Sequence, residues 1–150
     1  MDYSKITDDL FIGTNPLVSD YHFLYDLGVR LIINMRWDHP PEPNPHDLDL
    51  KLLWLRTIDN PLFPIPIDKL VQGAQAALET IQAGGKVYVH CAYGRHRSVA
   101  MGAAILIAQG YSPREAMDLI KAKRSAADPD IFYIRRRILR FAQRWKKLGN

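Results

Sequence analysis

The only cysteine of the sequence lies in the stretch that is richest in groups able to bind an anion. Residues 86–98 read KVYVHCAYGRHRS, so Cys91 is followed within six positions by Arg95, His96 and Arg97. A thiolate is a strong nucleophile, and a guanidinium presents planar N–H donors that match two oxygens of a phosphate. These residue types at this spacing indicate a site where a cysteine attacks a bound anion.

The flanking segments place this loop between a strand and a helix. KVYVH is short and largely apolar, whereas RSVAMGAAILIAQG has the small and apolar composition of a buried helix. Backbone N–H groups at the start of a helix lack intrahelical partners and carry partial positive charge. Gly94 permits the backbone angles with which successive N–H groups curl inward, and Arg97 adds its paired donors. The loop therefore favours a tetrahedral dianion.

The same positive field acts on the thiol of Cys91. A cysteine near a helix N-terminus and cationic groups has a pKa of roughly 3.5–7.5 instead of about 8.5, so we expect a thiolate at neutral pH. A nucleophile beneath an oxyanion cradle predicts phosphoryl transfer through a cysteinyl-phosphate intermediate. Ser98, in the first turn of the helix, has two interpretations that stay open: its hydroxyl donates to the sulfur, or it caps the helix.

Three other interpretations of this stretch fit its composition less well. A nucleotide-binding P-loop requires Gly-Lys-Ser or Gly-Lys-Thr after its glycines, and the sequence has neither. A zinc site requires several Cys or His at ligand spacing, whereas His90 and His96 flank an arginine-rich loop that repels a cation. An inert cysteine is usually buried among apolar groups, which is the opposite of an arginine-lined glycine loop. We therefore expect neither a metal nor a cofactor.

The pattern His90-Cys91-x-x-Gly94-x-x-Arg97-Ser98 resembles the HCxxGxxR[ST] signature of the cysteine-dependent protein tyrosine and dual-specificity phosphatases. Low-molecular-weight tyrosine phosphatases and arsenate reductases are similar in Cys-x5-Arg, but they keep that cysteine near the N-terminus. The resemblance implies catalytic roles for Cys91, Arg97 and Ser98, and leaves His90 as either a group that tunes the thiolate or a core histidine. The residues that it implies for phosphate binding are Ala92, Tyr93, Gly94, Arg95, His96 and Arg97.

The resemblance also implies a general acid on a mobile loop some thirty residues before the cysteine. Asp59, in RTIDNPLFPIPID, lies at that distance, at the end of an expected strand and the start of a proline-rich loop. Asp68 is the competitor, which we assign as the cap of the helix that follows Pro66. Asp38 is a third candidate, in a proline-rich turn. We therefore predict that Asp59 protonates the leaving group and then activates water.

The order of elements predicts an α/β fold with a central, mostly parallel sheet flanked by helices. Apolar runs of strand length alternate with segments of helical spacing, as in parallel sheets covered on both faces. Ligands of such sheets bind beyond the carboxyl ends of the strands, where Cys91 lies. The resemblance adds the three-layer sandwich of protein tyrosine phosphatases, as a single domain spanning residues 1–150. We expect strands at 10–14, 30–35, 50–58 and 86–90, and helices at 18–29, 66–82, 97–110, from Ser112-Pro113 onward, and at about 129–147.

Composition and charge restrict the function less sharply. The chain has 150 residues and a formal net charge of +4, and its last twenty positions carry seven Lys or Arg and no acid. That segment suits contact with nucleic acid or an anionic membrane surface, although a solvated helix face is the simpler interpretation. No apolar run approaches the about 20 residues of a membrane span, and the N-terminus does not resemble a signal peptide. Because a lone cysteine fits a reducing compartment, we expect a cytoplasmic enzyme.

The cysteine loop departs from the family in having Tyr93, Arg95 and His96 where small residues are common. Extra basic residues here are frequent in lipid-directed and RNA-directed relatives. We expect a phosphomonoester hydrolase of the protein tyrosine/dual-specificity type, acting on a phosphorylated protein or another phosphomonoester. The alternatives are an RNA 5′-triphosphatase or phosphoinositide phosphatase of the same chemistry, with nucleic acid only as substrate, and a phosphate-binding module that has lost catalysis. The oligomeric state is not predicted.

Overall fold

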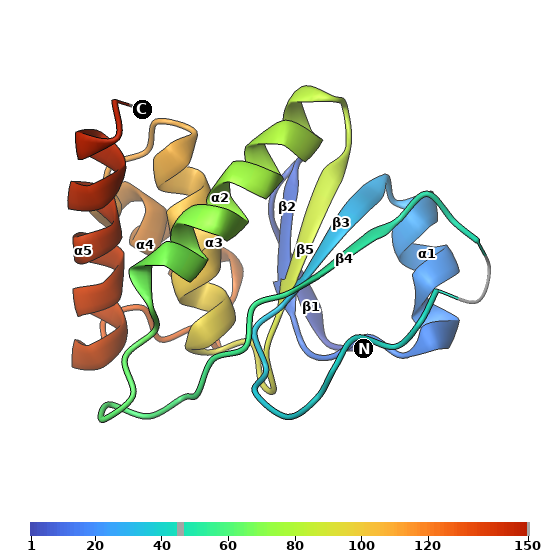
Figure 1. Ribbon diagram of the computed structural model, residues 1–150, viewed down its shortest axis with the longest axis horizontal. Helices are drawn as coiled ribbons and strands as arrows, with labels where there is room; N and C mark the ends of the chain where they lie inside the picture. The colour runs from blue at the N-terminus through green and yellow to red at the C-terminus, as the bar shows by residue number, and fades with distance from the viewer. Residues whose placement is uncertain (45–46, 150) are drawn as a thin grey trace.

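A five-stranded sheet forms the centre of the computed structural model, which describes residues 1–44 and 47–149 (Figure 1). The strands are β1 (Tyr3–Thr7), β2 (Leu10–Gly13), β3 (Val29–Asn34), β4 (Lys51–Trp54) and β5 (Lys86–His90). Their order is β1-β2-β5-β3-β4, so the strand that leads to Cys91 lies in the middle. Only β1 pairs in the antiparallel sense, and the predicted mostly parallel sheet is confirmed.

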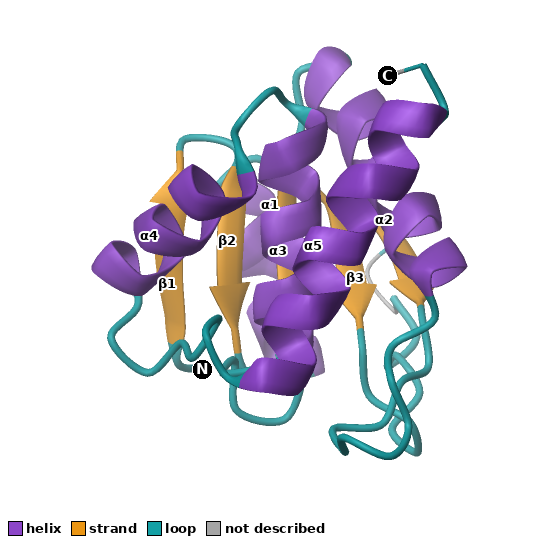
Figure 2. Cartoon of the chain, turned by 90° about the vertical axis from the view of Figure 1, so that its left-hand side faces the viewer, coloured by secondary structure: helices purple, strands orange, loops and turns teal. Residues whose placement is uncertain are grey.

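Helices cover both faces of the sheet and complete three layers (Figures 1 and 2). One face carries α1, and the other carries α2 to α5, with α3 buried along nearly its whole length. Among the described residues, no helix is both long and apolar enough to cross a membrane. The helices are a 3₁₀ turn at Val18–Asp20, α1 (Tyr21–Asp26), α2 (Ile67–Gln82), α3 (Arg97–Ala108), α4 (Pro113–Lys123) and α5 (Phe132–Lys147).

Two apolar cores explain why the central strands read as continuous apolar runs. Successive side chains of a strand point to opposite faces of the sheet. In β5, Val87 and Val89 belong to the larger core beneath α2 to α5, whereas Tyr88 belongs to the core on the α1 face. A strand that is buried on both faces has no polar side to alternate with its apolar side.

The carboxyl ends of the parallel strands meet at one edge of the sheet. Asn34 at the end of β3 pairs with both Trp54 of β4 and His90 of β5. The Met35 amide continues this ladder by donating to the carbonyl of His90 at 2.9 Å. The loops that follow β3, β4 and β5 therefore start side by side, and Cys91 is the first residue of one of them.

The sequence analysis missed β1 and misplaced several boundaries. The stretch YSKIT is short and mostly polar, and as an edge strand it lacks a strong apolar pattern. The helix expected at 18–29 begins as a 3₁₀ turn and stops before Gly28, which has a φ of 101°. The last helix begins at Phe132, later than expected, because Ile131 is extended and occupies the N-cap.

We expect Ser112→Ala to lower the free energy of unfolding by about 1 kcal/mol, because it removes the cap of α4. The Ser112 hydroxyl accepts from the Glu115 amide at 3.1 Å, and the Glu115 carboxylate accepts from the Ser112 amide at 2.9 Å. Ser125→Ala, in the exposed turn after α4, is the matched control and should change little. Urea denaturation measures both, and equal stability of the two variants would contradict the capping role.

Candidate active site

Cys91 follows β5 directly and is almost completely buried, with 3% of its surface exposed. Its Sγ lies 3.1 Å from the hydroxyl of Ser98 in the first turn of α3. Burial raises the pKa of the thiol, but hydrogen bonds from Ser98 and from the Gly94 amide, with the charge of Arg97, outweigh burial and lower the pKa. The N-cap of α3 is His96, with no side-chain capping bond, so the contact with sulfur is the interpretation of Ser98 that the geometry supports.

The loop after β5 is shaped by hydrogen bonds from outside it. The carbonyls of Tyr93 and Gly94 accept from the Arg124 guanidinium at 3.1 and 2.8 Å, and the carbonyl of Arg95 accepts from the Asp128 amide at 3.0 Å. In a trans peptide, the C=O and the following N–H point in opposite directions. Because three successive carbonyls are held outward, the amides that follow them are turned toward the interior of the loop. That arrangement forms a nest for an anion.

Arg124 holds the loop after β5 in shape, and the sequence analysis missed it. Its side chain is buried, and besides the loop carbonyls it contacts the Asp2 carboxylate and the Ser4 hydroxyl, each at 3.1 Å. Gly94 has a φ of 66°, and a Cβ there would lie 2.6 Å from the Arg124 guanidinium. Position 94 therefore requires glycine for two reasons. In the sequence, Arg124 ends the basic run KAKR and does not differ from its solvated neighbours.

Arg97 is anchored to the segments that follow two other strands, β3 and β4. Its Nη1 donates to the Thr57 carbonyl at 2.9 Å and to the Met35 carbonyl at 3.4 Å, and the Thr57 hydroxyl donates to the same Met35 carbonyl at 2.5 Å. The Nε of Arg97 is buried without a partner among the described residues. A buried donor without an acceptor is costly. A phosphate oxygen in the cavity that Arg97 lines would satisfy it.

A cavity of about 220 Å³ brings the predicted nucleophile, acid and anion-binding residues together. It is smaller than sites that enclose drug-sized ligands, at about 300–1,000 Å³, and therefore suits the phosphate group rather than a whole substrate. The other predicted site residues lie around it: Gly94 and Ser98 are buried beside Cys91, and Ala92 is half-buried in the loop. The residues that line the cavity are Asp59, Cys91, Tyr93, Arg95, His96 and Arg97.

Asp59 is held through both carboxylate oxygens. Oδ2 lies 2.8 Å from Nδ1 of His96, and Oδ1 accepts a hydrogen bond from the Tyr133 hydroxyl at 2.6 Å. Burial raises the pKa of Asp59, but these hydrogen bonds and the charges of His96 and Arg97 outweigh burial and lower the pKa. An ionised carboxylate only accepts, so Nδ1 of His96 is the donor.

Tyr133 is the second residue that the sequence analysis missed. Its ring packs edge-on against that of His96, with the centroids 5.8 Å apart. Burial and the Asp59 carboxylate raise the pKa of Tyr133 to about 12, so it stays a donor at neutral pH. Nothing in the sequence marks it, because it adjoins the apolar stripe of α5 and lies far from Asp59 along the chain.

Asp68 and Asp38, the competing acid candidates, lie outside the cavity. Asp68 is exposed and pairs with Arg144 of α5 at 2.8 Å. The N-cap of α2 is Pro66, and Asp68 lies in the first turn without a capping bond, so its assignment as the helix cap is wrong. The helix starts two residues earlier than that assignment requires, at Ile67, whose side chain is buried in the core. Asp38 lies in an exposed bend after β3.

His90 lies at the end of β5, outside the residues that line the cavity. Its ring packs 6.0 Å from that of Tyr88, and its Nδ1 has no partner among the described residues. Burial, followed by the charges of Arg36 and His39, lowers the pKa of His90 to about 3. A neutral imidazole does not stabilise the thiolate by its charge.

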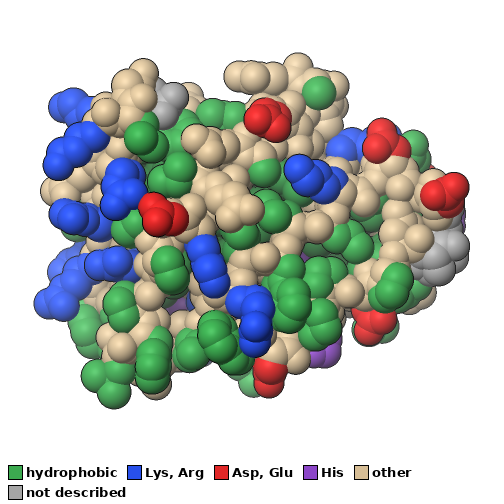
Figure 3. Space-filling view, viewed as in Figure 1, with side chains coloured by type: hydrophobic (Ala, Val, Ile, Leu, Met, Phe, Trp, Pro, Cys, Tyr) green, Lys and Arg blue, Asp and Glu red, His purple; other side chains and the backbone are tan. Residues whose placement is uncertain are grey.

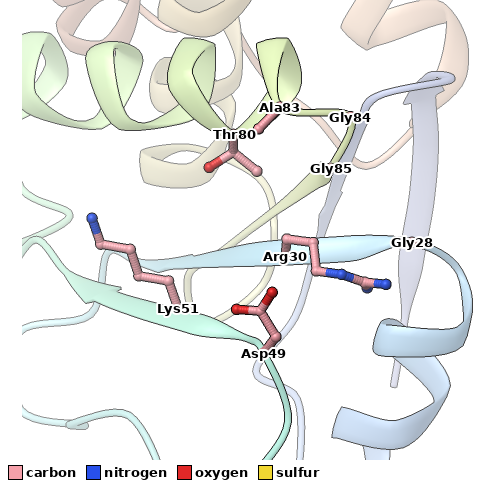
Figure 4. A pocket seen from close by; sticks show the side chains of 8 residues that line it. All are labelled: Gly28, Arg30, Asp49, Lys51, Thr80, Ala83, Gly84 and Gly85. Carbon is pink, nitrogen blue, oxygen red and sulfur yellow. The ribbon is translucent and has the colours of Figure 1, made fainter.

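A larger cavity, of about 490 Å³, lies at the opposite edge of the sheet, where β3, β4 and β5 begin (Figure 4). Arg30 lines it, but its guanidinium already donates to the carbonyls of Tyr25 and Val29 and stacks on the Tyr25 ring at 3.7 Å. None of the described residues that line this cavity carries a thiol or an imidazole. Its size therefore does not make it the reaction site.

Comparison with known proteins agrees with this geometry. Residues 10–143 match the family model described as "Dual specificity phosphatase, catalytic domain". The human protein named phosphatidylglycerophosphatase and protein-tyrosine phosphatase 1 is 34% identical over 131 residues, which cover 82% of this chain and 65% of that protein. Mouse dual specificity phosphatase 28 is 27% identical over 134 residues, which cover 86% of this chain and 77% of that protein.

Solved structures share the fold. A crystal structure of PTPMT1 in complex with PI(5)P matches this chain with a TM-score of 0.85 at 26% identity, covering 99% of each chain. The family match runs from the start of β2 into α5, and thus includes the strand, loop and helix around Cys91 and the loop of Asp59. The chain spans just under two thirds of the human relative's length. This chain therefore belongs to the dual specificity phosphatases, and its fold and chemistry are those of a cysteine-dependent phosphatase domain.

Proposed function

We propose that this chain hydrolyses phosphate monoesters with Cys91 as nucleophile, Arg97 and the loop amides as phosphate-binding groups, and Asp59 as acid and then base. One observation carries the proposal. The Cys91 sulfur is buried yet lies 3.1 Å from the Ser98 hydroxyl, in a cavity that Arg97 and Asp59 also line. Nucleophile, anion cradle and proton donor thus converge on one cavity of about 220 Å³.

The reaction takes two steps in this proposal. In the first, a bond forms between the Cys91 sulfur and phosphorus while the bond from phosphorus to the leaving oxygen breaks, and Asp59 gives that oxygen its proton. In the second, Asp59 removes a proton from water, the water oxygen attacks phosphorus, and the sulfur–phosphorus bond breaks. Inorganic phosphate and the thiolate are released. Arg97 and the amides hold the equatorial oxygens throughout.

Asp59 must carry a proton in the first step, although its contacts lower its pKa in the ligand-free enzyme. A bound phosphate dianion adds negative charge to the cavity that Asp59 lines, and a like charge raises the pKa of a carboxyl. Substrate binding therefore favours the acid form. Tyr133 and His96 keep the carboxyl in place while it changes its protonation state.

Two kinds of phosphomonoester carrier are supported for this site. Membership of the family supports phosphotyrosine on a protein. The human relative's name includes phosphatidylglycerophosphatase, and PTPMT1 was crystallised with PI(5)P, which support a phosphorylated lipid. Support for a 5′-triphosphorylated RNA as substrate comes from Arg95 and the basic α5 alone. His96 adds nothing to it, because His96 is bound to Asp59. The small cavity accommodates the phosphate of each carrier.

We further propose that residues 1–150 form one catalytic domain that works in a reducing compartment such as the cytoplasm. All the described elements pack against one sheet and its two cores, which supports a single domain. An ionised thiol survives best where disulfide formation and peroxide are limited, which supports the compartment.

A substrate panel tests the proposal: para-nitrophenyl phosphate, a phosphotyrosine peptide, a vesicle-borne phosphoinositide and 5′-triphosphorylated RNA, each with EDTA present. We expect turnover of the aryl phosphate, and a loss of about 10⁴-fold or more in Cys91→Ser, because the nucleophile is gone. That variant should still bind inorganic phosphate, since the loop amides and Arg97 remain. Turnover by Cys91→Ser near the wild-type rate would contradict covalent catalysis.

Asp59→Asn should lower kcat by about 10²–10⁴-fold and flatten the basic limb of its pH profile, because no group remains to protonate the leaving oxygen. Asp68→Asn is the matched control and should behave as wild type, since Asp68 is exposed and paired with Arg144. A steady-state pH profile measures both. If only Asp68→Asn showed the loss, the acid would be misassigned.

Ser98→Ala should raise the pKa of Cys91, because the lost hydroxyl donates to the thiolate and not to the thiol. Alkylation by iodoacetamide follows the thiolate fraction, so its midpoint should move to higher pH. Ser125→Ala controls for the loss of a hydroxyl elsewhere. An unchanged alkylation midpoint in Ser98→Ala would show that the contact with sulfur is not what ionises the thiol.

Tyr133→Phe should raise the pKa of Asp59, since the tyrosine hydroxyl donates to the ionised carboxylate. The first step needs protonated Asp59, so the basic limb of the kcat profile should move to higher pH. The value of kcat should fall by up to about 10²-fold as the carboxyl loses orientation. Tyr111→Phe, between α3 and α4, is the control. A basic limb at the wild-type position would contradict the contact.

A further inference from the structure

The loop that carries Asp59 turns at two large apolar side chains that lie in solvent. Leu62 is 82% exposed and Phe63 57% exposed. The turn is held by Asn60, whose side-chain oxygen accepts from the Leu62 amide at 2.8 Å and whose carbonyl accepts from the Phe63 amide at 3.0 Å. Single exposed apolar residues are common, so the meaning of this pair depends on its surroundings.

More large apolar side chains are exposed around the same edge of the sheet. Trp37 follows β3, Tyr93 lies in the loop after β5, and Phe132 immediately precedes the tyrosine that binds Asp59. Figure 3 shows apolar side chains gathered along the lower edge of the molecule, where the loop between β4 and α2 lies in Figure 1. We define the apolar rim as Trp37, Leu62, Phe63, Tyr93 and Phe132, all of which are exposed.

A groove of about 320 Å³ is lined by three residues of this rim, Trp37, Leu62 and Phe63. Arg56 in the groove stacks on the rings of Trp37 and Trp54, at 4.3 and 5.0 Å. Thr57 also lines the groove, and its carbonyl accepts the hydrogen bond from Arg97. The rim thus adjoins the groups that bind phosphate. The groove is lined by Trp37, Arg56, Thr57, Ile58, Leu62, Phe63, Pro64, Pro66 and Lys69.

Cationic side chains lie next to the rim. Arg56 and Lys69 line the groove, Arg95 lines the phosphate cavity, and Arg136 lies 5.7 Å from the ring of Phe132. Figure 3 shows further Lys and Arg side chains above the apolar lower edge and along α5. Acidic residues also lie near the rim. Asp38 is exposed, Asp59, Asp68 and Asp130 are bound to Tyr133, Arg144 and Arg114, and the Asp128 carboxylate lies 3.8 Å from Nε2 of His96.

We propose that the apolar rim and its cationic neighbours dock this domain on the surface of an anionic lipid bilayer, with the phosphate cavity facing the headgroups. The inference rests on the proposed function and names its substrate class, a phosphate monoester carried by a lipid headgroup. Exposed apolar side chains flanked by Lys and Arg are the pattern of proteins that lie in a membrane interface. The apolar groups enter the acyl boundary, and the cations contact anionic headgroups.

A bilayer fits this surface better than a phosphopeptide does. The rim residues come from four segments around the cavity instead of lining one groove, and Leu62 projects from the turn of its loop. A short peptide would contact the groove and leave Tyr93 and Phe132 in water. Lipid chains rearrange around a projecting side chain, so one surface covers the whole rim.

Co-sedimentation of the full chain with vesicles tests the docking, with phosphatidylcholine alone compared with phosphatidylcholine containing phosphatidylglycerol. We expect wild type to bind the anionic vesicles and to be released as salt is raised. The double variant Leu62→Ser/Phe63→Ser should bind about tenfold or more weakly. Leu148→Ser removes a side chain that is 50% exposed at the other end of α5, and it should bind as wild type. Circular dichroism confirms that each variant is folded.

Hydrolysis of para-nitrophenyl phosphate, measured in parallel, separates this inference from the proposed function. Turnover of the aryl phosphate without binding to anionic vesicles would overturn the docking alone. Binding to vesicles without any turnover would support the docking and overturn the proposed function. Equal loss of vesicle binding in Leu148→Ser would also overturn the docking. If the rim variant kept its vesicle binding and lost only turnover of the phosphotyrosine peptide, the docking would be overturned in favour of a protein partner.

Discussion

A sulfur with almost no access to water, surrounded by groups that lower its pKa, is the constraint on which the rest of this structure depends. Taking an anion out of water is costly unless nearby donors replace the lost solvent. Here the donors are the Ser98 hydroxyl, the Gly94 amide and the Arg97 guanidinium. Ser98 is positioned by the first turn of α3 and Gly94 by the loop after β5, and the Arg97 side chain is held by carbonyls of the segments that follow β3 and β4. The fold acts as a frame that holds these donors around one atom.

The acid and the anion-binding groups are joined through the backbone as well as through the cavity. Arg97 donates to the Thr57 carbonyl, two residues before Asp59. Arg97, the proposed phosphate-binding cation, therefore also fixes the point from which the loop of the proposed acid departs. His96 adds a second link, because it begins α3 and binds the Asp59 carboxylate. Asp59 is thus placed relative to Cys91 by groups within the phosphate-binding loop itself.

The parts of the structure that could be predicted from the sequence are those formed by residues close together along the chain. The strand, loop and helix around Cys91 are contiguous, and the cap of α4 by Ser112 is completed within four residues. Arg124 and Tyr133 act on the site across the fold, and their residue types are common on helix surfaces, so no local pattern distinguishes them. Asp68 shows the opposite error. Its position near the start of a helix suggested a cap, but the helix begins at the buried Ile67, and Pro66 occupies the N-cap position.

Arg124 links β1, the first strand of the sheet, to the loop that contains Cys91. Its guanidinium holds the carbonyls of Tyr93 and Gly94 with one side and the Asp2 and Ser4 side chains with the other. An edge strand is paired along one side only, which makes local opening easier there than in the centre of a sheet. When β1 frays, Arg124 loses the partners that hold its charge, and the amides around the sulfur lose their alignment. Conditions that make β1 less ordered should therefore also make the Cys91 thiol less reactive.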